Sequence, residues 1–118
     1  KGVIYNHTTA GIVIKGFKNY SLVYLNSNSK TIYTVFIGKD KIPGILFGGK
    51  VIKIKYIPKY HKIQKGDLVV TSGLDKVFYE GVKVGKIDKI RKTDLYQEAI
   101  ITPFYDSYHP TYFYVVKN

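Results

Sequence analysis

Apolar and polar residues alternate along much of the chain with the period of two that is typical of a β-strand with one buried face. The alternation is clearest at residues 51–56, VIKIKY, where Ile52, Ile54 and Tyr56 share the phase expected to face a core and the lysines share the other. Shorter runs of β-branched and aromatic residues predict further strands at residues 11–14, 21–25 and 31–37. No segment combines the apolar period of a helix with capping residues, so the pattern predicts an all-β chain.

Turn-forming residues divide the predicted strands into two groups. The Asn-Ser-Asn-Ser run at residues 26–29 is a hairpin-loop signal between two of them. Pro58 follows the clearest strand, and because proline has no backbone N–H to pair, residues 57–62 are interpreted as a connector. We therefore expect two small β-barrel or sandwich lobes in tandem, residues 1–57 and residues 58–118.

The stretch at residues 65–86, KGDLVVTSGLDKVFYEGVKVGK, constrains the backbone most strongly. A glycine followed by a carboxylate opens an apolar run, a Thr-Ser-Gly-Leu turn closes it, and two glycines interrupt the next run. The odd apolar spacing across the last glycine predicts a β-bulge or sharp bend, and the carboxylate is expected to accept backbone N–H groups in its turn. The predicted turn and bulge residues are Gly66, Asp67, Gly73, Gly81 and Gly85.

The composition adds a globular class and a strong positive charge. Of the 118 residues, 45% are hydrophobic, which argues against disorder, and no apolar run approaches the ~20 residues that span a bilayer. The formal net charge is +11, but Arg91 is the only arginine, and bidentate phosphate or base recognition favours arginine. We interpret the dispersed lysines as a solvated surface, with binding to lipid headgroups, acidic polymers or nucleic acid as the alternative. The absence of cysteine excludes disulfides and thiolate metal sites and leaves the compartment open.

Residues suited to catalysis are few and scattered. Ser72 lies in the Thr-Ser-Gly-Leu turn and lacks a nucleophile motif followed by an oxyanion glycine pair. The histidines lie outside core strand patterns, and none has a partner at metal-ligand spacing. The histidines and carboxylates considered are His7, His61, His109, Asp67, Asp75 and Asp106. We expect no catalytic residue, no metal site and no cofactor.

The run at residues 31–37 is apolar on both of its phases. A barrel strand normally exposes one face to water, so the second apolar face must be covered, either within the chain or by a partner. Tyrosine, with twelve copies, is also a residue type enriched in interface hot spots. We predict a partner-binding surface in the first lobe that contains Tyr33, Phe36, Ile37 and Phe47.

The carboxy-terminal region is dense in aromatic residues around a turn. Tyr112 and Tyr114 share a face opposite Phe113. An exposed aromatic strand can add to the edge of a second copy, so Tyr112 and Tyr114 are predicted to support self-association.

Several of these stretches resemble motifs of MreC, a family of bacterial rod-shape-determining proteins. The segments GDLVVTSGL at residues 66–74 and GVKVGK at residues 81–86 are similar to its central signature, and GILFGG at residues 44–49 is similar to its GILxG block. The resemblance extends over nearly the whole chain, and its central block is specific. The chain departs from the family at Tyr79, where proline is usual, and at Asp75, where a second glycine is frequent.

The resemblance implies a non-enzymatic scaffold at the periplasmic face of the bacterial inner membrane. Such a scaffold maintains rod shape by binding and activating a class B penicillin-binding protein that synthesises peptidoglycan during elongation. It would have β lobes related to trypsin-like barrels and would form homodimers or filaments. We expect part of the first barrel strand, a coiled coil and a membrane helix to lie upstream of Lys1, providing the membrane anchor and the link to MreD and the MreB complex.

Two other functions remain alternatives at this stage. A small basic β-barrel with exposed aromatic residues is also typical of proteins that bind single-stranded nucleic acid, whose affinity falls steeply with salt. A trypsin-fold hydrolase would use Ser72 as its nucleophile. The scaffold interpretation predicts neither nucleic-acid binding nor catalysis.

Overall fold

Every regular element in the computed structural model, which describes residues 1–5, 7–16, 21–104 and 114–115, is a β-strand. The ten strands are β1 (Gly2–Tyr5), β2 (Thr8–Gly16), β3 (Ser21–Leu25), β4 (Ile32–Ile37), β5 (Ile42–Phe47), β6 (Lys53–Pro58), β7 (Leu68–Thr71), β8 (Lys83–Lys92), β9 (Tyr96–Pro103) and β10 (Tyr114–Val115). The expectation of an all-β chain is confirmed. The described part of the chain holds no helix of the length and hydrophobicity needed to cross a membrane.

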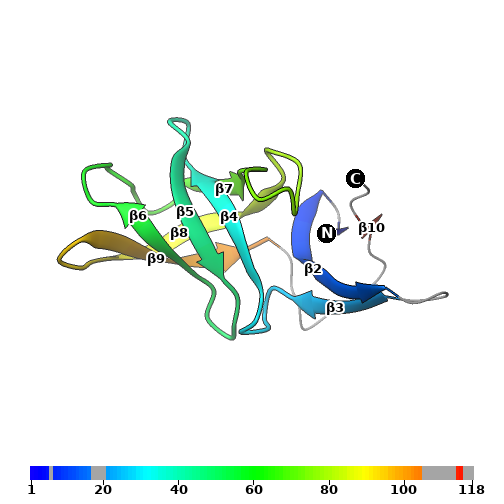
Figure 1. The fold of residues 1–118 in the computed structure, drawn as a ribbon. Coiled ribbons are helices and arrows are strands. Elements are labelled where there is room, and N and C mark those ends of the chain that lie inside the picture. The colour runs from blue at the N-terminus through cyan, green and yellow to red at the C-terminus, as the bar shows by residue number, and fades with distance from the viewer. Residues whose placement is uncertain (6, 17–20, 105–113, 116–118) are drawn as a thin grey trace.

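Six of the strands close into a barrel in the order β4-β5-β6-β9-β8-β7 (Figure 1). All neighbouring pairs in this ring are antiparallel, and the β4–β7 and β8–β9 pairs complete it. Because the barrel is closed, each of its strands is hydrogen-bonded to a neighbouring strand along both edges. Each barrel strand therefore has an inner face that packs the core and an outer face that is available to solvent or to a partner.

The other four strands form a small sheet at one end of the barrel, in the order β10-β1-β2-β3 (Figure 1). The two parts meet through a parallel pair between Thr8 of β2 and Lys83 of β8. The backbone N–H of Gly2 also donates to the carbonyl of Val77, in the loop between β7 and β8, at 2.7 Å. The small sheet is thus attached to the barrel close to the glycine-rich segment.

The chain does not divide at the expected boundary between residues 57 and 58. That point falls within β6; β4 and β5 precede it and β7 to β9 follow it, yet all six strands belong to the same closed barrel. Pro58 does end β6, but the chain then re-enters the sheet it has just left. Residues 26–29 likewise do not form a hairpin loop, because β3 pairs with β2 whereas β4 pairs with β5 and β7. They instead connect the small sheet to the barrel.

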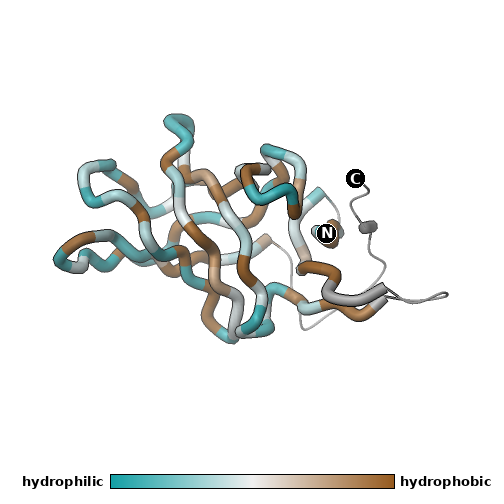
Figure 2. Tube along the Cα trace, viewed as in Figure 1, coloured by the Kyte–Doolittle hydropathy of each residue, from teal (hydrophilic) through white to brown (hydrophobic). Residues whose placement is uncertain are grey.

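The interior of the barrel is filled by one cluster of buried apolar side chains. The inward phase of β4 contributes Tyr33, Val35 and Ile37 to this cluster. A second, smaller cluster built on Val3 and Ala10 lies in the small sheet. Hydropathy along the trace shows the corresponding alternation of hydrophobic and hydrophilic positions on the barrel strands (Figure 2).

A buried ring of three polar side chains joins the two parts. The Tyr33 hydroxyl lies 2.9 Å from the Thr9 hydroxyl and donates to Asn26 Oδ1 at 3.2 Å. The Asn26 amide in turn donates to the Thr9 hydroxyl at 3.2 Å and to the Thr9 carbonyl at 3.0 Å. Thr9 lies on β2, Asn26 on the segment between β3 and β4, and Tyr33 on β4. The ring therefore links the small sheet to the barrel wall. Burial raises the pKa of the Tyr33 hydroxyl far above its usual value.

Strand β6 departs from simple alternation near its end. The pairing of β6 with β9 shifts register between Ile54 and Ile57, and Tyr56 has a φ of 59° in the left-handed region. This bulge turns Tyr56 outward, where it is 52% exposed, and places Ile57 in the core. The expectation that Tyr56 faces the core is therefore wrong, because an alternating pattern does not reveal a bulge within the strand.

The glycine-rich segment forms β7, the loop that follows it and the start of β8. The glycines at its turns have positive φ angles: Gly66 at 92°, Gly73 at 74° and Gly81 at 91°. The Asp67 carboxylate accepts the backbone N–H of Gln64 at 2.8 Å within the first turn. At Gly85 the β7–β8 register shifts, and a Cβ on this residue would lie 2.3 Å from the Thr102 carbonyl oxygen. Glycine is required there because the backbones of β8 and β9 approach closely beside the bulge.

Candidate partner-binding surface

The outer face of β4 and β5 is apolar except at Thr34. In the antiparallel register Ile32 pairs with Phe47, Thr34 with Ile45, and Phe36 with Pro43. We call the apolar members of these pairs the β4–β5 face: Ile32, Phe36, Pro43, Ile45 and Phe47. Ile32 is 48% exposed, and the two phenylalanines are half-buried. A soluble barrel normally exposes polar side chains on this face, so a continuous apolar strip is a candidate docking surface.

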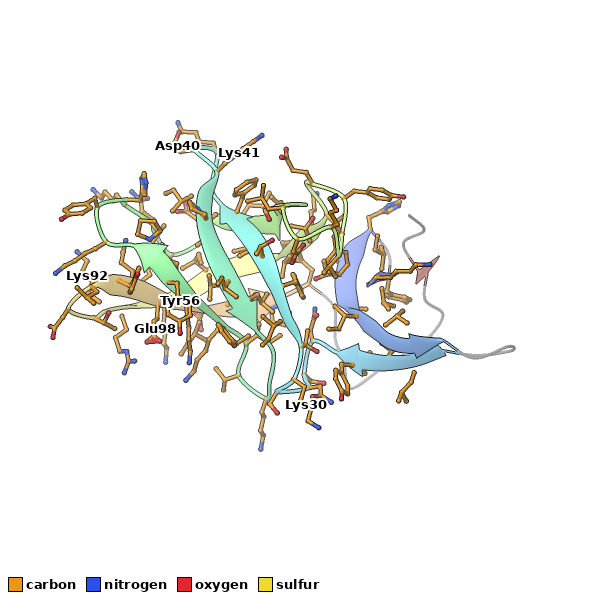
Figure 3. The ribbon with its side chains drawn as sticks, in the orientation of Figure 1. Lys30, Asp40, Lys41, Tyr56, Lys92 and Glu98 are labelled. Carbon is orange, nitrogen blue, oxygen red and sulfur yellow. The ribbon has the colours of Figure 1, made fainter. Side chains whose placement is uncertain are left out.

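Lysines border the β4–β5 face. Lys41 Nζ lies 6.0 Å from the centroid of the Phe36 ring, and Lys55 Nζ lies 5.1 Å from that of Phe47. Lys41 also forms an exposed ion pair with Glu80 at 3.0 Å and lies at the turn between β4 and β5 (Figure 3). An apolar centre surrounded by exposed charges is the usual composition of a protein–protein interface.

A hollow of about 600 Å³ lies beside Phe36. It is bounded by β4 and β7, whose outward side chains Leu68 and Val70 line it together with Phe36. The turn residues Gly38 and Asp67 also line it. A concavity next to an exposed apolar strip can receive an anchoring side chain of a partner.

The structure corrects two of the four predicted partner-binding residues. Tyr33 and Ile37 are 1% and 0% exposed and belong to the barrel core, so neither can contact a partner of the folded protein. Phe36 and Phe47 occupy the opposite phase and lie on the outer face. The two phases of the run at residues 31–37 thus separate into a core side and a surface side.

Ile32 and Ile45 also lie on this face, although they are not among the predicted binding residues. Ile32 shares its phase with Phe36, and Ile45 shares its phase with Phe47, so the same alternation could have identified both. Tyr56 extends the apolar surface toward β9: its ring centroid is 6.2 Å from that of Phe47 and 5.6 Å from that of Tyr96. No signal in the sequence indicated this extension, because it depends on the bulge in β6.

Among the residues that the structure describes, those considered for catalysis are not arranged as a triad. The Ser72 hydroxyl lies 2.5 Å from the Thr34 hydroxyl and accepts the N–H of Leu74 at 3.2 Å, and neither group is a base. His7 and His61 are exposed. Asp75 accepts the backbone N–H of Thr34 at 2.8 Å, which fastens the loop after β7 to β4. Within the described residues, no three His, Asp or Glu side chains are grouped as metal ligands. His109 and Asp106 lie outside the described residues.

Positive side chains surround a carboxylate on the outer face of β6, β8 and β9. Glu98 forms an ion pair with Arg91, and this hydrogen bond, followed by the charges of Arg91, Lys55 and Lys53, lowers the pKa of the Glu98 carboxyl. Lys53, Lys89 and Arg91 line a hollow of about 280 Å³ next to it. Figure 3 shows Glu98 and Tyr56 on this side of the barrel.

The structure describes only part of the two predicted self-association residues. Tyr112 lies outside the described residues, as does the side chain of Tyr114. The backbone of Tyr114 belongs to β10 and pairs with Ile4 of β1.

Comparison with known proteins identifies a family. The family model for the rod shape-determining protein MreC, barrel core, matches residues 1–117. The chain is 37% identical over 87 residues to the cell shape-determining protein MreC of Listeria monocytogenes. That match covers 69% of this chain and 30% of the Listeria protein, so the chain spans about a third of its relative.

Solved structures agree with this comparison. MreC from Listeria monocytogenes superposes with a TM-score of 0.84 at 31% identity over 92% of this chain and 56% of that chain. MreC in a complex with penicillin-binding protein PBP2 from Helicobacter pylori has a TM-score of 0.80 at 28% identity, over 90% of this chain and 68% of that chain. A structure of the major periplasmic domain of the cell shape-determining filament MreC has a TM-score of 0.79 at 28% identity, over 90% of this chain and 70% of that chain.

Proposed function

The chain belongs to the MreC family of rod shape-determining proteins, and from this premise we propose that it is an extracytoplasmic scaffold that binds a penicillin-binding protein of cell-wall elongation. Two of the structural relatives support this proposal. One is MreC in a complex with PBP2, and another is the major periplasmic domain of MreC. The proposed role for this chain is to provide a binding surface, and we assign no catalytic step to it.

The observation that carries the proposal is the apolar β4–β5 face. The inward phases of both strands already fill the core, so the outward phase is not needed to fold the barrel. Its residues nevertheless form a continuous strip, with Ile32 opposite Phe47 and Phe36 opposite Pro43. Exposed apolar surface of this kind is retained when a partner covers it. We place the penicillin-binding protein on this face, with Phe36 and Phe47 as anchors.

Binding can activate an enzyme only if the scaffold has a higher affinity for the active conformation than for the inactive one. A rigid barrel wall suits this role, because its residues are held by strand pairing on both sides and lose little freedom on binding. We propose that the β4–β5 face stabilises an active conformation of the penicillin-binding protein in this way.

The remaining roles concern the longer protein to which we assign this chain. We propose that segments beyond it anchor the protein in the inner membrane and connect it to MreD and the MreB complex. Formation of homodimers or filaments, with Tyr112 and Tyr114 at the contact, is likewise a proposal.

The β4–β5 face can be tested by replacing Ile32 and Phe36 together with serine. Both side chains lie on the outer face, so the barrel should remain folded while the apolar strip is interrupted. We expect the affinity for the elongation penicillin-binding protein of the same organism, measured by biolayer interferometry, to fall at least tenfold, since truncation of an interface anchor costs about 2 kcal/mol or more.

The control is Leu74→Ser, which removes an exposed apolar side chain from the loop after β7, away from the β4–β5 face. Circular dichroism and the urea midpoint should show that both variants are folded. If the folded double variant binds the penicillin-binding protein as tightly as the unmodified chain, the proposed location of the interface is wrong. If the unmodified chain itself fails to bind, the proposed function is wrong.

A further inference from the structure

Two turns at the end of the barrel farthest from the small sheet expose large apolar side chains. Tyr60, in the turn after β6, is 99% exposed, and Leu95, in the turn between β8 and β9, is 76% exposed. We call these two turns, residues 58–62 and 92–96, the basic tip. They extend from the same end of the barrel, opposite β2 and β3 (Figure 1). Neither side chain contributes to the core, so neither is explained by folding.

Hydrogen bonds hold the basic tip in one shape. The N–H of His61 donates a hydrogen bond to the Pro58 carbonyl at 3.2 Å, which closes the first turn. The buried amide of Gln97 donates to the carbonyls of both Pro58 and His61. The two turns are linked because Lys59 Nζ donates to the Asp94 carbonyl at 3.0 Å. Tyr60 and Leu95 therefore project from a fixed double turn.

The surroundings of these two side chains are positively charged. The Arg91–Glu98 ion pair near the base of the hairpin is internally neutral. Beyond that pair, the exposed charged residues of the basic tip are Lys59, Lys62, Lys92 and Asp94, which gives three positive charges against one negative charge. Of these lysines, none forms an ion pair in the part of the chain that the structure describes. Figure 3 shows Lys92 at this end of the molecule.

This combination matches the chemistry of an anionic bilayer surface. Aromatic residues concentrate at the headgroup level of membranes, and apolar side chains next to lysines allow shallow insertion together with attraction to anionic headgroups. Each lysine near such a surface adds to the electrostatic attraction to the anionic headgroups. A protein partner fits less well, because two protruding turns offer little of the ~800 Å² per side that a stable interface buries. A nucleic acid also fits less well, because base stacking uses several aromatic rings along a groove.

We propose that the basic tip binds the surface of a bilayer that contains anionic phospholipid, with Tyr60 and Leu95 in the headgroup layer and the lysines against the lipid phosphates. This contact goes beyond the proposed binding of a penicillin-binding protein and uses other residues than the β4–β5 face. It would add a membrane contact within the barrel to the anchor proposed for the longer protein.

A single-tryptophan probe tests the position of the tip directly, because the chain contains no tryptophan. Tyr60→Trp should show a blue shift of its emission when vesicles of phosphatidylcholine with phosphatidylglycerol are added, and no shift with phosphatidylcholine alone. Tyr79→Trp, at an exposed tyrosine of another loop, is the control and should not shift. Equal shifts for both probes, or a shift for neither, would overturn the proposal.

Co-sedimentation with the same vesicles tests the energetic contribution. The double variant Tyr60→Ser with Leu95→Ser should bind at least tenfold more weakly, whereas Leu74→Ser with Tyr79→Ser, which removes the same residue types elsewhere, should bind like the unmodified chain. Binding of the unmodified chain should fall as salt is raised. An equal loss of vesicle binding in both double variants would overturn the proposal. Competition by polyglutamate or a single-stranded oligonucleotide that binds the basic tip in preference to the vesicles would also overturn it.

Discussion

The ring formed by Thr9, Asn26 and Tyr33 predicts that removing a single buried oxygen atom destabilises the protein substantially. Because the Tyr33 hydroxyl donates to Asn26 Oδ1, the Thr9 hydroxyl is the donor in the 2.9 Å contact with Tyr33. The substitution Tyr33→Phe keeps the ring and its edge contact with Phe78, whose centroid is 4.9 Å away. It leaves the Thr9 hydroxyl without its acceptor and Asn26 Oδ1 without its donor.

The magnitude follows from these two groups. Leaving a buried polar group unsatisfied costs about 1–3 kcal/mol. With partial rearrangement of the two side chains, we expect Tyr33→Phe to lower the free energy of unfolding by about 2–4 kcal/mol. This is a large share of the roughly 5–15 kcal/mol that stabilises a typical domain.

Urea unfolding followed by circular dichroism measures the effect. Tyr60→Phe is the matched control, since it removes the same oxygen from a fully exposed tyrosine and should change the free energy of unfolding by less than about 0.5 kcal/mol. A Thr9→Val change combined with Tyr33→Phe should cost less than the sum of the two single changes, because both remove the same hydrogen bond. A Tyr33→Phe variant as stable as Tyr60→Phe would refute the network.

The pH dependence provides a second measurement on the same residue. Burial raises the folded-state pKa of Tyr33 above its usual value of 10.0, so the folded state holds this proton more tightly than the unfolded state. The stabilisation is fully present below pH 10.0 and is lost as the pH rises above that value. The unmodified chain should therefore lose more stability than Tyr33→Phe between neutral pH and pH values above the usual tyrosine pKa. Parallel stability curves for the two proteins would contradict this assignment.

Two further predictions concern the backbone and the surface charges. Gly85→Ala should destabilise the barrel by about 1–3 kcal/mol in urea unfolding, because its Cβ would lie 2.3 Å from the carbonyl oxygen of Thr102 on the neighbouring strand; an unchanged midpoint would show that β8 and β9 can separate freely. Arg91→Gln should raise the pKa of the Glu98 carboxyl in an NMR titration, because the arginine hydrogen bond is the largest cause of its lowered value. The ion pair should stabilise the fold at pH values above the unfolded-state pKa of the Glu98 carboxyl, and this contribution should be lost as the pH falls through the folded-state pKa. An unshifted Glu98 titration in Arg91→Gln would rule the ion pair out.

The strand pattern and the separation of faces were largely predictable from the sequence. The alternation in residues 31–37 separated Tyr33 and Ile37 from Phe36, and the structure keeps these two sets on opposite sides of β4. Their roles were less predictable. The pattern shows that both phases are apolar, but which phase faces the interior depends on the direction in which the sheet curves. The prediction therefore assigned two core residues to the binding surface.

The glycine-rich segment illustrates why local constraints can be deduced from sequence. The positive φ at Gly73 and the close approach at Gly85 each depend on the absence of a side chain, and glycine is the one residue that indicates such a position by itself. The turn at Asp67 similarly depends on a carboxylate and an N–H three residues apart. The turns at Gly73 and Asp67 need only nearby residues, so the order of the amino acids is sufficient to predict them, whereas the strand that Gly85 approaches, β9, is set by the tertiary pairing.

The division into lobes, the exposure of Tyr56 and the basic tip depended on the tertiary structure. Barrel closure pairs β4 with β7 and β8 with β9, and these long-range contacts place both sides of the expected boundary after residue 57 in one sheet. The bulge that exposes Tyr56 and the contact that brings Lys59 to Asp94 likewise join segments that are distant in sequence. The amino-acid order determined the strands, their two faces and the turns, because those depend on local sterics and periodicity. The choice of inner face and the grouping of surface residues were decided by the pairing of remote strands, whose free energy is a property of the closed barrel as a whole.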